Sequence, residues 1–215
     1  PFTIDKFEKG RSRLSTRREN MIKTTNMILE ELRSYANPKA KLSRMANQGE
    51  CFRITRGLYE TNKNTPGYLL AGSIYGPSYI SFEYALAYYN LIPEAVYTIT
   101  CATFEKKKKK IFQTPFGNFS YRDVPSAAFP LGINLIQEGE YFYRIAEPEK
   151  ALCDKLYTMS PVKNTEELAE LIFQNLRIEK EELLKLDAKK IEQLSNAYHA
   201  TNVAKFEILL RRMQK

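Results

Sequence analysis

The chain has 215 residues, with 33 Lys or Arg against 25 Asp or Glu and a formal net charge of +8. Its 43% hydrophobic content, with 14 Tyr and 12 Phe, supports a packed core and excludes global disorder. No run reaches the length of a membrane span, and three widely spaced cysteines with one histidine argue against a disulfide framework or a zinc site. We therefore expect a cytoplasmic protein with free thiols, with Cys101 and Cys153 buried, and with no metal or cofactor.

The positive charge is concentrated at one end of the chain. Residues 1–60 hold thirteen Lys or Arg and seven Asp or Glu, whereas the remainder is close to neutral. A basic end on a near-neutral body is typical of a protein that meets an anionic partner, most simply nucleic acid. Charge alone is equally compatible with a solvated basic tail.

Residues 1–20 have mixed charge and weak periodicity, and we treat them as an N-terminal extension. The chain starts at Pro1 rather than at a methionine, so Met21 is a candidate for the native start. Four arginines of this segment are candidates for phosphate contacts, namely Arg11, Arg13, Arg17 and Arg18.

Two helices are predicted after this extension. Apolar residues recur at helical spacing from Ile22 to Tyr35. Asn37 is then the predicted N-cap and Pro38 the first residue of a second helix, which runs to about Gln48 before Gly49. The short corner between the two helices is typical of a helix-turn-helix.

A short β-hairpin is predicted next, with its turn at residues 55–57. We expect Phe52, Ile54 and Leu58 to lie against the helices, and Arg53 to face away from them. Helix, helix and hairpin in this order indicate a winged helix-turn-helix.

The polar loop over residues 61–67 indicates a boundary between this domain, residues 21–62, and a larger α+β domain, residues 63–215. The elements predicted in the second domain are strands over 95–104, 110–113, 118–124 and 139–145, and helices over 81–89, 148–157, 165–176, 179–186 and 187–213.

The second helix carries polar and basic residues opposite its apolar side of Leu42, Met45 and Ala46. Arg pairs with guanine in the major groove, and Asn or Gln pairs with adenine. We therefore predict base contacts from Arg44, Asn47 and Gln48, and phosphate contacts from Lys39, Lys41 and Ser43. Arg53 and Arg56 suit a wing that touches the neighbouring DNA backbone or the minor groove. The alternative is an amphipathic helix with a solvated basic face.

Other signals favour structural roles. The run Lys106 to Lys110 indicates a solvated loop or strand edge rather than a second phosphate-binding patch. The pair Gly72-Ser73 lacks the following carboxylates that a nucleotidyltransferase needs. His199 has no catalytic set around it in sequence, and no phosphate-binding glycine motif occurs, so we predict no enzyme. We assign the aromatic-rich stretches to the core rather than to base stacking.

Three segments together resemble the AbiEi family of type IV antitoxins, which regulate transcription in viral defence by abortive infection: GECFRITRGLYE, PSYISFEYALAYYNLIPE and RIAEPEKALCDKLY. The resemblance implies an N-terminal winged helix-turn-helix and a C-terminal antitoxin domain. It also implies repression of the protein's own operon at inverted repeats in double-stranded DNA. The family opposes a nucleotidyltransferase toxin, AbiEii, and stable toxin binding is not expected.

Carried over by position, the resemblance implies DNA contacts from Lys39, Lys41, Ser43, Arg44, Asn47, Arg53 and Arg56. Ten residues of the other two segments match as fold determinants, namely Tyr79, Ser81, Ala85, Leu86, Pro148, Glu149, Lys150, Ala151, Leu152 and Asp154. The chain departs from the family pattern at Asn90, where Gly is common. It also shows one clear helix before the recognition helix.

A palindromic operator needs two copies, so a homodimer on DNA is expected. Two other functions stay open. One is an interaction module that contacts a toxin or another protein through its C-terminal domain. The other is an RNA binder that uses the aromatics and the lysine run.

Overall fold

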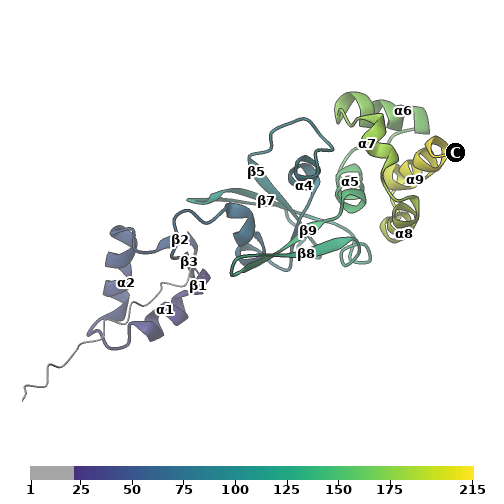
Figure 1. Cartoon of the computed structure of the whole chain (residues 1–215). Helices are drawn as coiled ribbons and strands as arrows, with labels where there is room; N and C mark the ends of the chain where they lie inside the picture. Colours follow the sequence, from purple (N-terminus) through teal and green to yellow (C-terminus); the bar gives the residue numbers. More distant parts are fainter. Residues whose placement is uncertain (1–21) are drawn as a thin grey trace, which may run out of the picture.

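The computed structural model describes residues 22–215 and has a mixed α+β fold. Two helices and a small sheet lie at one end, a six-stranded sheet lies in the middle, and a group of helices forms the other end (Figure 1). Within residues 22–215 no helix combines the length and the apolar character needed to cross a membrane.

The N-terminal unit, residues 22–60, contains both predicted helices and the predicted hairpin. Its elements are β1 (Ile22–Thr24), α1 (Thr25–Glu31), α2 (Pro38–Asn47), β2 (Phe52–Thr55) and β3 (Leu58–Glu60). The three strands form an antiparallel sheet in the order β1-β3-β2. The N-cap prediction is confirmed, because the Ala40 amide donates to Asn37 Oδ1 at 3.0 Å.

The first helix is shorter than the predicted Ile22 to Tyr35. Ile22 pairs with Glu60 in the sheet, and the helix begins only at Thr25. β-Branched Ile22 and Thr24 favour the extended conformation, and the Thr24 hydroxyl accepts a hydrogen bond from the Met27 amide. The helical periodicity therefore misassigned a strand, because half-buried Ile22 packs against the main core of the central region.

The hairpin faces the opposite way from the prediction for Phe52, Ile54 and Leu58. Ile54 belongs to the large core of the central region, and Leu58 packs against that core. The Phe52 ring meets Phe116 edge-on, with ring centroids 6.3 Å apart. The side of the hairpin that meets the helices is instead the one that carries Tyr59, which packs on their small core.

The central sheet has strand order β6-β7-β5-β4-β9-β8. Its strands are β4 (Tyr79–Ile80), β5 (Thr98–Thr103), β6 (Lys110–Thr114), β7 (Gly117–Asp123), β8 (Ile133–Glu138) and β9 (Tyr141–Ala146). Pairs β5–β7 and β4–β9 are parallel and the other three are antiparallel. The four predicted strands are present with shifted ends, whereas β4 and β8 were not predicted.

Helices flank and follow this sheet. They are η1 (Gly67–Leu70), α3 (Ala71–Ile74), α4 (Phe82–Tyr88), α5 (Pro148–Tyr157), α6 (Thr165–Glu170), η2 (Leu171–Asn175), α7 (Lys180–Leu184), α8 (Ala188–Tyr198) and α9 (Thr201–Met213). The predicted helix over 187–213 is wrong, because His199 has a φ of +48° and breaks it into α8 and α9. Asn90 also has a positive φ, +57°, as its place after α4 requires.

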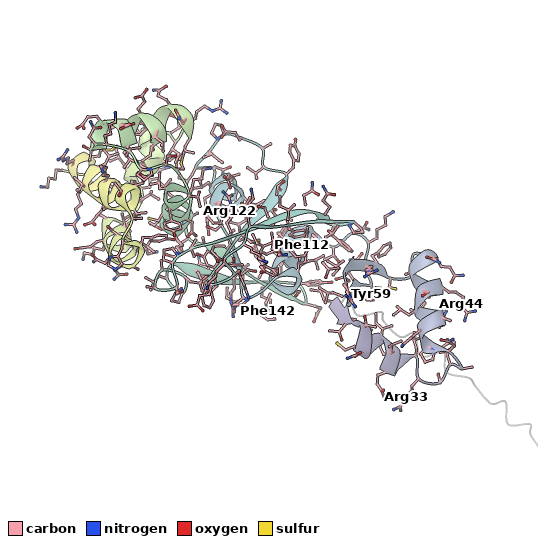
Figure 2. The ribbon with its side chains drawn as sticks, turned by 180° about the vertical axis from the view of Figure 1, so that it is seen from behind. Arg33, Arg44, Tyr59, Phe112, Arg122 and Phe142 are labelled. Carbon is pink, nitrogen blue, oxygen red and sulfur yellow. The ribbon has the colours of Figure 1, made fainter. Side chains whose placement is uncertain are left out.

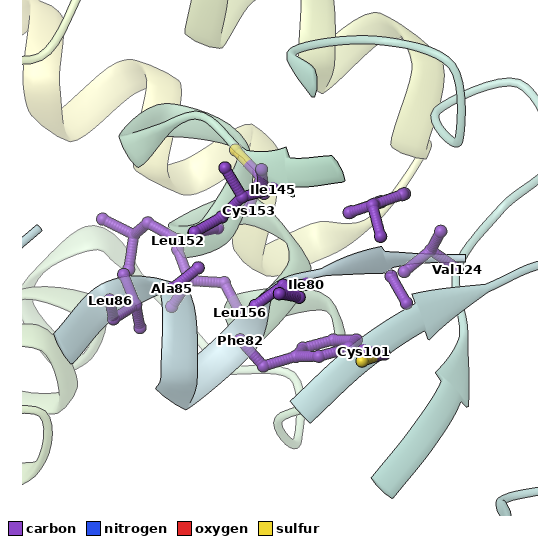
Figure 3. Packing of buried hydrophobic residues seen from close by; sticks show 14 of the residues in the cluster. Ile80, Phe82, Ala85, Leu86, Cys101, Val124, Ile145, Leu152, Cys153 and Leu156 are labelled. Atoms are coloured by element: carbon purple, nitrogen blue, oxygen red, sulfur yellow. The ribbon is translucent and has the colours of Figure 1, made fainter. Parts of the chain in front are cut away.

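The main core lies where α4 and α5 meet the central sheet (Figure 3). Phe82 and Leu86 of α4 and Leu152 and Leu156 of α5 are fully buried there. Cys101 and Cys153 are free and buried, as predicted, and burial raises the pKa of both thiols. Cys51 is also free and buried, within the small core of the N-terminal unit.

A buried polar network ties α5 to β4 and α8. Lys150 Nζ lies 3.3 Å from Asp154 Oδ1, and it donates to the Tyr198 hydroxyl at 2.5 Å and to the Ala128 carbonyl at 2.8 Å. Asp154 accepts from the hydroxyls of Ser81, Tyr79 and Tyr198. Burial lowers the pKa of Lys150, and the charge of Asp154 opposes that shift. The ion pair between Lys150 and Asp154, four residues apart on α5, is thus part of a wider network.

Candidate nucleic-acid interface

Helix α2 is oriented by its apolar side. Leu42 is buried with Ile28, Leu32 and Cys51 in the small core, and Met45 and Ala46 pack at its edge. A helix anchored along one side presents its opposite side to solvent. Arg44 lies on that opposite side and projects away from the rest of the molecule (Figure 2).

The structure places seven of the eight predicted contact residues on the exposed surface: Lys39, Ser43, Arg44, Asn47, Gln48, Arg53 and Arg56. Lys41 is half-buried, and its Nζ lies 5.8 Å from the centre of the Tyr35 ring. Gln48 is the C-cap of α2 rather than a residue within the helix. The predicted base-reading row therefore consists of two helical residues and one residue at the helix end.

The predicted contact set contains the unpaired cations of the N-terminal unit. Lys23 is paired with Glu31 and Arg33 with Glu30, each at 2.8 Å. Among residues 22–215, no acidic side chain forms an ion pair with any of the five cations of the contact set, which are Lys39, Lys41, Arg44, Arg53 and Arg56. The electrostatic field of these five positive charges is thus not cancelled by nearby acidic side chains.

Glu60, the acid at the end of β3, is directed inward. Its side chain is fully buried and accepts hydrogen bonds from the amides of Thr61 and Asn62 and from the Tyr141 hydroxyl, the last at 2.8 Å. This carboxylate joins the small sheet to β9 and does not face the cations' solvent side. The exposed surface of α2 and the hairpin is therefore basic.

The hairpin tip is held against the start of α1. Gly57 has a φ of +84°, which favours glycine, and its carbonyl accepts from the Thr25 amide at 2.9 Å. Arg56 is exposed at this tip. A fixed tip presents Arg56 at a defined place relative to α1 and α2.

Arg53 does not face away from the helices as predicted. It pairs with Tyr59, and residues that pair across antiparallel strands share a face, so Arg53 lies on the helix side of the sheet. It remains exposed because β2 is an edge strand, and its Nε donates to the Thr55 carbonyl at 3.3 Å. The Arg53 side chain therefore lies on the same side of the small sheet as α2, whereas the prediction placed it on the other side.

The lysine run forms an exposed loop that leads into edge strand β6, in agreement with the structural interpretation. Lys106 Nζ lies 5.3 Å from the centre of the Tyr75 ring, and the Lys107 amide donates to Asp123 Oδ2 at 2.6 Å. Arg11, Arg13, Arg17 and Arg18 lie outside the described residues. Over residues 22–215, no three acidic, His or Cys side chains are grouped to hold a metal ion.

Comparison with known proteins adds no assignment: no family model matches the chain, and neither does any curated protein.

Proposed function

We propose that residues 21–62 form a winged helix-turn-helix in which α2 is the recognition helix and the β2–β3 hairpin is the wing. In this proposal Arg44, Asn47 and Gln48 contact base edges in the major groove. The cations beside them contact phosphates and set the register of the protein on the duplex.

The proposal is carried by the five unpaired cations that lie on α2 and the hairpin. Two other cations of the same unit are neutralised by acidic neighbours, so the uncancelled charge is confined to the elements that would meet DNA. A helix fixed along its apolar side by Leu42 also needs no rearrangement to enter a groove. Both features favour duplex DNA over a solvated basic surface.

The proposed biological role is that of an antitoxin similar to the AbiEi family. The protein represses its own operon at inverted repeats and opposes a nucleotidyltransferase toxin without forming a stable complex with it. The support is the ordered set of three sequence segments, together with a buried network that includes Tyr79, Ser81, Lys150 and Asp154 of those segments.

Fluorescence anisotropy with the DNA upstream of the operon tests the DNA-binding proposal. Arg44→Ala should weaken specific binding by about 1–3 kcal/mol, because a bidentate contact to guanine is lost. Arg33→Ala is the matched control, since Arg33 is also exposed but pairs with Glu30 outside the contact set. Arg44→Ala that binds as tightly as the unmodified protein would show that the recognition row is wrong.

Salt dependence separates phosphate contacts from base contacts in the same assay. Neutralising four phosphates per copy with Lys39, Lys41, Arg53 and Arg56 predicts a slope of log affinity against log salt of about −3.6. Lys39→Ala should reduce that slope by about 1 on every sequence, and it should leave sequence preference unchanged. An absence of binding at low salt would overturn the DNA-binding proposal itself.

The antitoxin role requires a separate experiment in cells. The chain is expressed together with the product of its neighbouring gene, which the proposal expects to be a nucleotidyltransferase toxin, and growth is compared with that of cells that express that product alone. Rescue of growth without recovery of the toxin in a pull-down supports the proposal. Rescue that depends on a stable complex would favour the interaction-module alternative.

A further inference from the structure

Within residues 22–215, strand β8 (Ile133–Glu138) is one of the two edges of the central sheet, and its single strand partner is β9. One hydrogen bond shows which residues of β8 bond to β9: the Glu147 amide donates to the Gly132 carbonyl at 2.8 Å. Antiparallel pairs alternate between hydrogen-bonded and non-hydrogen-bonded. Residues 134, 136 and 138 therefore bond to β9, and the amides and carbonyls of Ile133, Leu135 and Gln137 point outward from the sheet.

This outer edge lacks the features that usually block strand addition. Residues 133–137 contain no charge and no proline, and the β8–β9 register runs without a bulge. Leu135 is 64% exposed at its centre, and Phe142 is 60% exposed on the same face. The single charged residue of β8, Glu138, is at its end and accepts from the Tyr68 hydroxyl.

The opposite edge of the same sheet is protected. Strand β6 begins with Lys110 and follows the rest of the lysine run, and its neighbour Phe116 is covered by Phe52 of the N-terminal unit. Its Ile111 is exposed to nearly the same extent as Leu135, at 62%. The β6 edge is thus protected by lysines and the β8 edge is not, although both edges carry an exposed apolar residue.

We propose that β8 pairs with β8 of a second copy of this chain, antiparallel, with Leu135 facing the partner's Leu135 on a two-fold axis. Each odd-numbered residue of β8 must face an odd-numbered residue of the partner's strand, so that the side chains of one face stay on one face across both sheets. This register also pairs Ile133 with the partner's Gln137. All three outward residues then exchange backbone bonds, about six in total. An edge that bonds to itself is an isologous interface.

The inference goes beyond the proposed DNA binding and does not depend on it. An interface made by one strand pair is small, so the dimer should be weak and should depend on protein concentration. Sedimentation velocity without DNA, from about 10 µM to about 1 mM, should show a rise toward the dimer. A monomer throughout that range would overturn the proposal.

Two matched variants locate the interface by the same measurement. Leu135→Lys should abolish dimerisation, because it places two ammonium groups face to face on the axis. Ile111→Lys should leave it unchanged, because Ile111 has the same exposure on the protected edge. Equal loss in both variants, or none in Leu135→Lys, would place the contact elsewhere.

Oxidative cross-linking tests the register. In the proposed pairing the two Cα atoms at position 135 are about 5.5 Å apart, within the range of a disulfide. Leu135→Cys should therefore form a covalent dimer, and the three native cysteines are buried and should give little background. Gln137→Cys should not, because its two copies are four residues apart along the strands, about 13 Å. Cross-linking of Gln137→Cys as fast as Leu135→Cys would overturn the register.

Discussion

Gly67 occupies a position that has no room for a side chain. A Cβ there would lie 2.2 Å from the Phe116 carbonyl oxygen and 2.9 Å from Ile99 Cδ1. The first of these neighbours is backbone in the turn between β6 and β7, which cannot move without disturbing two strands. This glycine thus allows the start of η1 to touch the central sheet directly.

Gly67→Ala is therefore expected to destabilise the fold by about 1–3 kcal/mol, since the clash must be relieved by a backbone shift. Gly72→Ala is the control. Its Cβ meets nothing within 4 Å and it lies in a helix, where Ala is favoured over Gly by about 1 kcal/mol. Urea denaturation should move the two midpoints in opposite directions, and a Gly67→Ala protein as stable as the parent would contradict this account.

At the scale of elements, α5 is held in place by its buried ion pair as well as by its apolar residues. Asp154 receives three hydroxyl hydrogen bonds and faces Lys150, so a change in either partner leaves a charge without compensation. Breaking a buried pair is costly, whereas breaking an exposed pair has little effect.

Asp154→Asn should lower the free energy of unfolding by about 3–5 kcal/mol, because the Lys150 ammonium stays buried without its counter-charge. Combining it with Lys150→Met should cost less than the sum of the two single changes, which a double-mutant cycle measures. Arg33→Ala, which breaks an exposed pair, should cost at most about 1 kcal/mol. Additive effects at Lys150 and Asp154 would show that the two side chains are not coupled.

Local sequence signals predicted some elements to the residue. Helix α5 begins at Pro148 and ends at Tyr157 as predicted, because proline at the first position and the apolar spacing agree. The break at His199 was missed because no glycine or proline marks it and His adopts the left-handed conformation there. Strand β8 was missed because Asn134 and Gln137 interrupt its apolar pattern at a half-exposed edge.

The exposure of the candidate interface could be predicted from the helical wheel, since one buried stripe fixes the direction of every other side chain on α2. The orientation of the hairpin could not. Alternation shows that Phe52 and Ile54 share a face, but it does not show which of two layers covers that face. The covering residue, Phe116, is more than sixty positions away in the chain.

At the scale of the whole molecule, buried and half-buried tyrosines link the stability of the fold to alkaline pH. Burial and the hydrogen bond to Glu138 raise the pKa of Tyr68 to about 12. Burial, assisted by the hydrogen bond to Glu60, also raises the pKa of Tyr141 to about 12. The pKa values of Tyr79 and Tyr198 are also raised, again by burial first and by the charge of Asp154 second.

A tyrosine whose folded pKa lies above its unfolded value of about 10 stabilises the fold fully below pH 10. That contribution is lost as pH rises through the folded pKa, so stability should fall between about pH 10 and pH 12. Tyr141→Phe should make the fall shallower, as measured by urea midpoints at several pH values. Tyr97→Phe, at a side chain 88% exposed, is the control, and an equal change in both variants would contradict this explanation.

The small sheet of the N-terminal unit has a consequence for how this chain can be divided. Its strands are covered on one side by α1 and α2 and on the other by the central region, so a fragment ending near residue 62 would leave Phe52, Ile54 and Leu58 uncovered. Such a fragment would tend to self-associate. The N-terminal unit would therefore not transfer to another protein as an independently folding domain, and the residues on both sides of its contact with the central region are constrained to change together.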